Sequence, residues 1–256
     1  MKSFWIALAM YSKLPARRVE WDKKSLSWAL CWFPAVGVAA GALLFFWLWL
    51  AQALGLGAPL RAAIALLIPV AVSGGIHLDG FCDTADALGS NQTREKKLEI
   101  LKDSHTGAFA VFCCGLYLIL FFAAWCQAET ASLRSAGAMA LTPVLSRSLS
   151  GLAAVTQPNA RGSGLLATFT APMDCAKARV VLAVWIGSCA VAMACLSPWT
   201  GGAAVLAAAG SFFYYIAMSR RQFGGVTGDL AGYFLQVCEC AMVLLAALAQ
   251  RAEVLL

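Results

Sequence analysis

Long apolar runs separated by short polar segments dominate the chain. A helix needs about 20 apolar residues to cross the hydrocarbon core of a membrane. Seven runs approach or exceed that length, at 28–54, 60–73, 108–126, 135–156, 178–196, 201–218 and 229–249. The run 135–156 gives the weakest signal, because Pro143 and Arg147 interrupt it. The pattern predicts an all-α fold, a polytopic integral membrane helical bundle with about seven transmembrane helices.

The composition supports this class. Hydrophobic residues make up 61% of the chain and charged residues 12%, and the mean hydropathy is +0.75, values that are not those of a soluble domain. No internal repeat is visible, so we expect one membrane domain over residues 1–256. The ten cysteines form no CxxC pair. Among them, Cys113, Cys114, Cys238 and Cys240 lie within apolar runs and are expected to be small buried hydrophobic residues, and no metal-thiolate or disulfide role is expected.

The basic residues predict the orientation in the membrane. If the N-terminus is inside, the inner segments are 1–27, 74–107, 157–177 and 219–228. Counted with Arg179, these segments hold 15 of the 19 basic residues. The positive-inside rule then places them in the cytoplasm. We expect a multi-pass protein of a bacterial or archaeal cytoplasmic membrane whose active face is cytoplasmic, with an amphipathic segment at 1–25 in the interface.

The polar segment 74–107 is predicted to be a short acidic cytoplasmic helix-turn-helix. It holds six of the thirteen acidic residues and both histidines. The first acidic row has the spacing i, i+4, i+7, which places its carboxylates within roughly 60° on one helix face. Its members are Asp79, Asp83 and Asp86. The second row has the spacing i, i+4, i+8 and consists of Glu95, Glu99 and Asp103.

Two acidic rows that face each other repel unless a cation lies between them. Mg²⁺ takes oxygen ligands and is commonly shared between carboxylates and substrate phosphates. We therefore predict a Mg²⁺ site formed by Asp79, Asp83, Asp86 and Asp103, with Glu95 and Glu99 as partial ligands. His77 and His105 flank the rows and are catalytic candidates, as a base or a ligand orienter. The alternatives are carboxylates that simply face water and imidazoles that are only hydrogen-bonded.

Basic and polar residues on the same predicted face suit an anionic diphosphate. The expected substrate-binding residues are Lys102, Arg147, Arg161, Arg220, Arg221, Thr227 and Asp229. Basic loops also bind anionic lipid, which is the alternative for each of them. Arg147 and Glu239 lie inside predicted spans, about 14–15 Å from the inner boundary at 1.5 Å per residue. We expect them to pair across a helix contact; alternatively, Arg147 reaches a substrate phosphate.

Several segments resemble the cobalamin synthase family, the adenosylcobinamide-GDP ribazoletransferases. The most specific are GGIHLDGFCDTADAL at 74–88 and REKKLEILKDSHTGAFAV at 94–111. The supporting segments are WFPAVG at 32–37, LSR at 145–147, RGSGL at 161–165 and GGVTGDLAG at 224–232. Ala87 and Ala110 stand where the family usually has glycine, which removes no chemical group.

The resemblance implies a Mg²⁺-dependent phosphotransferase that performs the last assembly step of cobalamin biosynthesis. Such an enzyme joins adenosylcobinamide-GDP to α-ribazole or its 5′-phosphate and releases GMP. The expected partners are these substrates and the lipid bilayer, without nucleic acid, and a homo-oligomer is compatible. Two rivals remain: another membrane diphosphate-using transferase, of the CDP-alcohol phosphotransferase or prenyltransferase type, and an ion-coupled transporter with carboxylates at the bilayer midplane.

Overall fold

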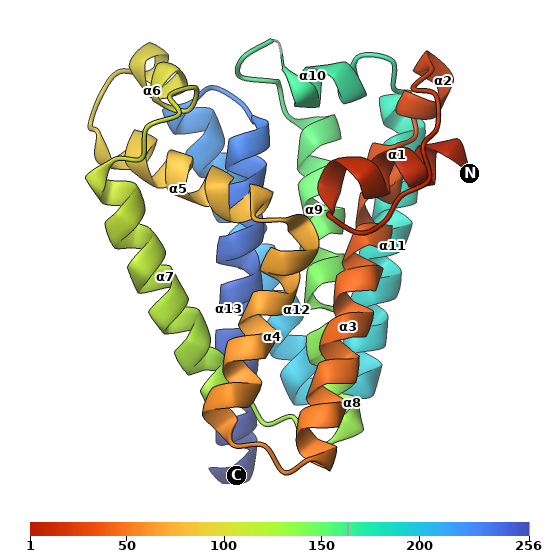
Figure 1. The fold of residues 1–256 in the computed structure, drawn as a ribbon, viewed down its shortest axis with the longest axis vertical. Coiled ribbons are helices and arrows are strands. Elements are labelled where there is room, and N and C mark those ends of the chain that lie inside the picture. The colour runs from red at the N-terminus through yellow and green to blue at the C-terminus, as the bar shows by residue number, and fades with distance from the viewer. Residues whose placement is uncertain (163, 256) are drawn as a thin grey trace.

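The protein is a bundle of long helices packed side by side (Figure 1). The computed structural model describes residues 1–162 and 164–255, so Ser163 of the RGSGL segment lies outside the described residues. Within that range there is no β-strand, and one isolated bridge joins Asn159 to Val226. The predicted all-α class is confirmed.

The chain forms long helices along the bundle and shorter helices at its ends (Figure 1). The long ones are α3 (Phe33–Ala53), α4 (Ala58–Ser73), α7 (Ala108–Gln127), α9 (Thr142–Thr156), α11 (Cys175–Leu196), α12 (Pro198–Gln222) and α13 (Gly228–Leu255). The shorter ones are α1 (Lys2–Tyr11), α2 (Lys23–Leu26), η1 (Leu30–Trp32), α5 (Ile76–Gly89), α6 (Arg94–Ile100), α8 (Leu133–Ala140) and α10 (Leu165–Thr170). Among these, α8 lies at the end opposite to α5, α6 and α10 (Figure 1).

The expected number of about seven spans agrees with the structure. Six helical segments of the described chain are long and apolar enough to cross a membrane, and the bent pair α4–α5 makes seven. In an 18-residue window of segment Leu133–Thr156, formed by α8 and α9, 83% is buried, whereas 17% of such a window in Cys175–Leu196 is buried. The apolar run at 135–156 is therefore weak for a physical reason. Its helix is enclosed by protein, so it can carry Arg147 and serines that a lipid-facing helix such as α11 could not.

A sharp bend after α4 turns the chain across the end of the bundle. Gly74 and Gly75 both have left-handed backbones, with φ of 65° and 84°, a conformation that glycine adopts without steric cost. The axes of α4 and α5 differ by 94°. As a result α5, which carries the first acidic row, crosses the end of the bundle (Figure 1).

The predicted inner segments gather at one end of the molecule. Figure 1 shows α1, α2, α5, α6 and α10 together at the upper end, with the C-terminus at the other. The segments 1–27, 74–107, 157–177 and 219–228 thus share one face, as the basic residues predict. The assignment of this face to the cytoplasm stays a prediction.

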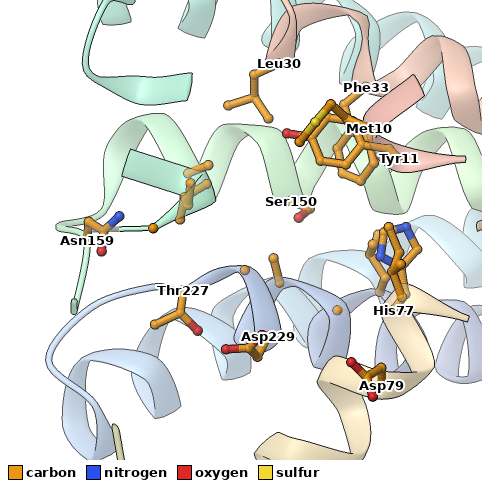
Figure 2. Close-up of a pocket in the computed structure, with 18 of the residues that line it drawn as sticks. Met10, Tyr11, Leu30, Phe33, His77, Asp79, Ser150, Asn159, Thr227 and Asp229 are labelled. Atoms are coloured by element: carbon orange, nitrogen blue, oxygen red, sulfur yellow. The ribbon is translucent and has the colours of Figure 1, made fainter. Parts of the chain in front are cut away.

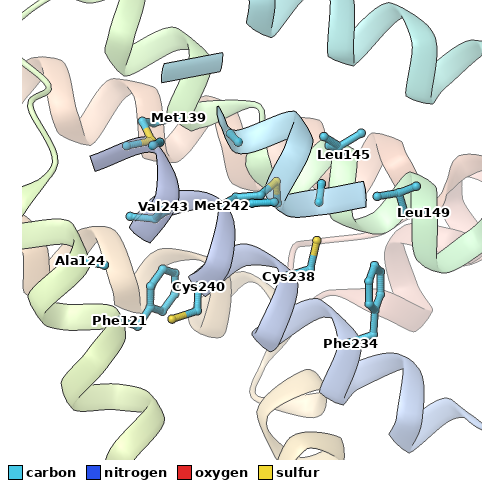
Figure 3. Close-up of a cluster of buried hydrophobic side chains, with 14 of the residues drawn as sticks. Phe121, Ala124, Met139, Leu145, Leu149, Phe234, Cys238, Cys240, Met242 and Val243 are labelled. Atoms are coloured by element: carbon cyan, nitrogen blue, oxygen red, sulfur yellow. The ribbon is translucent and has the colours of Figure 1, made fainter. Parts of the chain in front are cut away.

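The main core follows α13 through the bundle, where α7, α9 and α12 pack around it (Figure 3). Phe121, Leu145, Phe234 and Met242 are among its fully buried members. All ten cysteines are free, and Cys238 and Cys240 lie inside this cluster. The expectation of small buried side chains is confirmed for Cys238 and Cys240, whereas Cys113 and Cys114 are only partly buried.

Candidate functional site

A cavity of about 310 Å³ lies at the end of the bundle that carries the short helices. Side chains of α1, α3, α5, α9 and α13, with the loop before α10, line it. In Figure 2, Met10, Tyr11, Leu30 and Phe33 lie on one side. Facing them are Asp79, Thr227 and Asp229.

Two glycines bring α5 and α13 into close contact beside this cavity. A Cβ atom on Gly80 would lie 2.7 Å from the backbone oxygen of Asp229, and one on Gly232 would lie 2.9 Å from the backbone oxygen of His77. Such distances leave no room for a side chain. The contact places the first acidic row beside Asp229, which stands in the first turn of α13.

The carboxylates on these two helices repel each other. Burial, together with the negative charges of Asp79, Asp229 and Asp86, raises the pKa of Asp83 to about 6, and Arg161 offsets this only in part. A raised carboxyl pKa means that the charged form is poorly compensated by the surrounding protein. A divalent cation at this place would remove the repulsion.

Arg161 supplies positive charge at the cavity. Its Nη2 atom lies 2.8 Å from Oδ2 of Asp229 and donates a hydrogen bond of 2.9 Å to the backbone oxygen of Leu101. Asp229 Oδ2 therefore has a charged partner, whereas Nε of Arg161 has no acceptor. Both side chains keep hydrogen-bonding capacity for a ligand.

The residues present suit a magnesium ion, although they form no ready-made cage. Within the described residues, no three His, Cys, Asp or Glu side chains are grouped as a metal site. Mg²⁺ commonly takes only one or two protein carboxylates and completes its shell with water and substrate phosphate. Asp79, Asp83 and Asp229 supply oxygen atoms of this kind.

Asp86 has a structural role that the sequence did not reveal. Its two oxygens accept hydrogen bonds from the backbone nitrogens of Gly107, at 2.6 Å, and Ala110, at 2.7 Å. These are unpaired N–H groups at the start of α7, so Asp86 caps that helix. Its predicted contribution to the metal is not supported by this geometry.

The second acidic row does not face the first, so the expected pair of opposed acidic faces is wrong. Lys97 is buried and donates to Oε1 of Gln222 at 2.7 Å, which holds that face of α6 against the end of α12. Glu95 and Glu99 consequently point to solvent, where Glu99 pairs with Lys96 at 2.7 Å.

Asp103 and His105 also lie away from the cavity. The backbone N–H and the imidazole of His105 both contact Oδ1 of Asp103, at 3.0 and 2.7 Å. These hydrogen bonds lower the pKa of Asp103 below its usual value. With Asp86, the two residues line a separate open hollow. A catalytic role for His105 therefore lacks support from the structure, whereas His77 lines the cavity and its Nε2 has no partner.

Some of the predicted substrate-binding residues line the cavity and the others lie outside it. Arg161, Thr227 and Asp229 line the cavity. The side chains of Lys102, Arg220 and Arg221 are exposed outside it. Arg147 is almost fully buried and pairs with Glu239 at 2.8 Å, so the expected helix-to-helix pair is confirmed and its alternative role at a substrate phosphate is not supported.

The sequence pattern did not indicate the side of the cavity opposite the acids. Tyr11, Phe33, Ser150 and Leu235 line it. Phe33, at the start of α3, lies in the WFPAVG segment, and Tyr11 lies at the end of α1, but neither carries chemistry that would single it out. Their ring centroids are 4.4 Å apart.

Comparisons with known proteins identify the family. The family model described as cobalamin-5-phosphate synthase matches residues 3–247. Three proteins, each named adenosylcobinamide-GDP ribazoletransferase, are similar over almost their whole length. The one from Lachnoclostridium phytofermentans is 39% identical over 239 residues, which cover 93% of this chain and 90% of the relative.

The other two give the same result. The protein from Pseudomonas putida strain W619 is 38% identical over 256 residues, 97% of this chain and 100% of the relative. The protein from Clostridium perfringens strain 13 is 30% identical over 244 residues, 95% and 96% of the two chains. No solved structure matches. This chain therefore belongs to the cobalamin-5-phosphate synthase family.

Proposed function

We propose that the protein is a Mg²⁺-dependent adenosylcobinamide-GDP ribazoletransferase. It transfers the adenosylcobinamide phosphate group to α-ribazole or its 5′-phosphate and releases GMP, the last assembly step of cobalamin biosynthesis. The observation that carries the proposal is the family match over residues 3–247. The cavity supports it, because carboxylates from α5 and α13 meet Arg161 there.

The reaction is a phosphoryl-type transfer. A ribose hydroxyl attacks the phosphorus atom attached to the cobinamide side chain, the bond from that phosphorus to the bridging oxygen breaks, and GMP leaves with the oxygen while the hydroxyl proton is released. Mg²⁺ held by Asp79, Asp83 and Asp229 would neutralise charge on the diphosphate.

The protein groups have distinct roles in this proposal. Arg161 binds diphosphate oxygens through its guanidinium, whose Nε lacks an acceptor. The start of α13 presents its first backbone N–H groups to the same oxygens. Thr227 holds this turn in place, because its Oγ1 accepts a hydrogen bond of 3.2 Å from Leu230 N.

The active face is proposed to be cytoplasmic. The end of the bundle that contains the cavity carries 15 of the 19 basic residues, which favours retention on the inner side. Nucleotide substrates are soluble anions, so they would reach this face from the cytoplasm, and the net charge of +6 agrees with such partners.

A turnover assay tests the proposal. Purified protein in detergent is given adenosylcobinamide-GDP, α-ribazole and Mg²⁺, and adenosylcobalamin and GMP are separated by chromatography. Equal amounts of both products should appear, EDTA should stop their formation, and excess Mg²⁺ should restore it. A prenyl diphosphate with an acceptor serves as the rival substrate. A folded, monodisperse protein that forms no product from the first mixture would refute the proposal.

A further inference from the structure

The two sides of the cavity differ in chemistry, and the proposed transfer uses only one of them. The polar wall consists of Asp79, Asn159, Arg161, Thr227 and Asp229. The apolar wall consists of Met10, Tyr11, Leu30, Phe33, Ala154 and Leu235. Figure 2 shows labelled members of the two walls facing each other across the cavity.

The apolar wall is held in shape by the core behind it. Leu30, Phe33 and Leu235 belong to one buried cluster, against which Tyr11 and Ala154 pack. The ring of Phe33 lies between Tyr11, at 4.4 Å, and His77, at 5.9 Å, measured between ring centroids. A surface fixed from α1, α3, α9 and α13 is preorganised for a rigid, flat group.

The size of the cavity limits what can enter. Ligand pockets commonly measure about 300–1,000 Å³, and this one, at about 310 Å³, is at the small end. It can hold a group of nucleoside size. A corrin macrocycle with its nucleotide is much larger, so most of adenosylcobinamide-GDP would remain outside, with its diphosphate at the polar wall.

The chemistry of the wall distinguishes the two aromatic bases among the proposed substrates. Guanine carries donors and acceptors around its edge, and these would lose their hydrogen bonds against Leu30, Phe33 and Leu235, which costs free energy. The benzimidazole base of α-ribazole has a largely apolar edge and gains from burial there.

On the basis of the proposed function, we infer that the apolar wall binds the benzimidazole base of ribazole and determines which base is transferred. Tyr11 and Phe33 contact the flat base, and Ala154 sets the space available to it. With the base on this wall, the ribose of the same nucleoside extends towards Arg161 and Asp229. Its hydroxyl then lies next to the diphosphate that those residues hold.

The first test distinguishes an effect on the binding of α-ribazole from an effect on the binding of adenosylcobinamide-GDP. Tyr11→Ala should raise the KM for α-ribazole, and its Kd measured by equilibrium binding without the second substrate, by about tenfold or more. The KM for adenosylcobinamide-GDP should stay unchanged. Tyr11→Phe keeps the ring and should restore most of the affinity for α-ribazole that Tyr11→Ala loses. Met10→Ala is a milder change on the same wall and should shift the KM in the same direction by less.

A second variant tests specificity. Ala154→Phe fills the cavity and should lower kcat/KM for the benzimidazole nucleoside relative to that for the smaller imidazole nucleoside. Phe213→Ala is the matched control, because Phe213 is 72% exposed on α12 and does not line the cavity; it should change neither value. Size-exclusion profiles verify folding of every variant.

The possible failures are distinguishable. If the wild type is active but Tyr11→Ala, Met10→Ala and Ala154→Phe change only the KM for adenosylcobinamide-GDP, or change neither KM, the apolar wall does not bind the base. The proposed function would survive that result. If the wild type forms no product with either nucleoside, the proposed function fails and the inference fails with it.

Discussion

The guanidinium of Arg147 and the carboxylate of Glu239 lie 2.8 Å apart in the interior of the bundle, with 1% and 5% of the two side chains exposed. Ser146 Oγ donates to the same carboxylate oxygen at 2.7 Å, and Arg147 Nη1 also donates to the backbone oxygen of Pro143. This pair joins α9 to α13 beneath the cavity. It lets two ionised groups occupy a region where an unpaired charge would be costly.

Charge reversal tests this pair. Arg147→Glu and Glu239→Arg should each destabilise the protein by about 3–5 kcal/mol, because each leaves two like charges buried together. The double variant restores opposite charges and should recover much of the thermal stability measured in detergent. A double variant no more stable than the single ones would show that the pair does not hold the helices together.

Removal of carboxylates should divide the acidic residues into two groups. Asp79→Asn and Asp83→Asn should each lower turnover by about a hundredfold or more and raise the Mg²⁺ concentration needed, since they remove charge that would hold the ion. Glu95→Gln and Glu99→Gln, which change solvent-exposed side chains, should have small effects. Equal losses in all four variants would mean that the second acidic row closes over the site.

The close contact of α5 and α13 can be tested at Gly80. A methyl group there would meet the backbone of Asp229, so Gly80→Ala should push Asp79 away from Asp229 and lower activity. The matched control is Gly210→Ala on α12, because a Cβ at Gly210 meets nothing within 4 Å. It should leave activity unchanged and stabilise the helix by about 0.5–1 kcal/mol. Similar activity of both variants would contradict the positional role.

Arg161 should act mainly in substrate binding. Arg161→Ala is expected to raise the KM for adenosylcobinamide-GDP by about tenfold and to lower kcat by less, as loss of ground-state binding does. Arg221→Ala removes a charge that is exposed outside the cavity and serves as the control. An unchanged KM in Arg161→Ala would instead assign this arginine to the fold.

Cysteine labelling tests the orientation in the membrane. On a background without the ten native cysteines, Gln92→Cys should react only with reagent on the cytoplasmic side. Ala131→Cys, in the exposed turn before α8 at the opposite end of the bundle, should react only from outside. The opposite labelling pattern would invert the orientation and place the cavity on the outer face.

The sequence predicted the structure well where a feature depends only on the length, hydropathy and charge of one segment of the chain. Run lengths located the spans because a membrane helix must be long and apolar. The depth of Arg147 and Glu239 could be calculated because the helical rise per residue is fixed and because both are charges that need a partner in the membrane. The gathering of the polar loops at one end followed from the basic residues.

Prediction failed where a long-range contact decides the outcome. Periodicity placed Glu95 and Glu99 on one face of a helix, but the direction of that face depends on the hydrogen bond from Lys97 to Gln222, 125 residues away. Asp86 has the spacing of a metal ligand, yet it caps α7. The apolar wall was missed because Tyr11 and Phe33 look the same in sequence as aromatic residues that anchor any membrane protein.

The bend at Gly74 and Gly75 has a consequence for how the protein responds to lipid. Span α4 continues directly into α5, while α5 is clamped to α13 at Gly80. A bilayer thinner or thicker than the hydrophobic length of α4 changes the tilt of that helix. The backbone at Gly74 and Gly75 must then take up the change in the angle between α4 and α5. Any part of this change that the two glycines do not take up moves Asp79 relative to Asp229. Acyl-chain length therefore becomes a variable of the reaction itself, and turnover should pass through a maximum at one bilayer thickness.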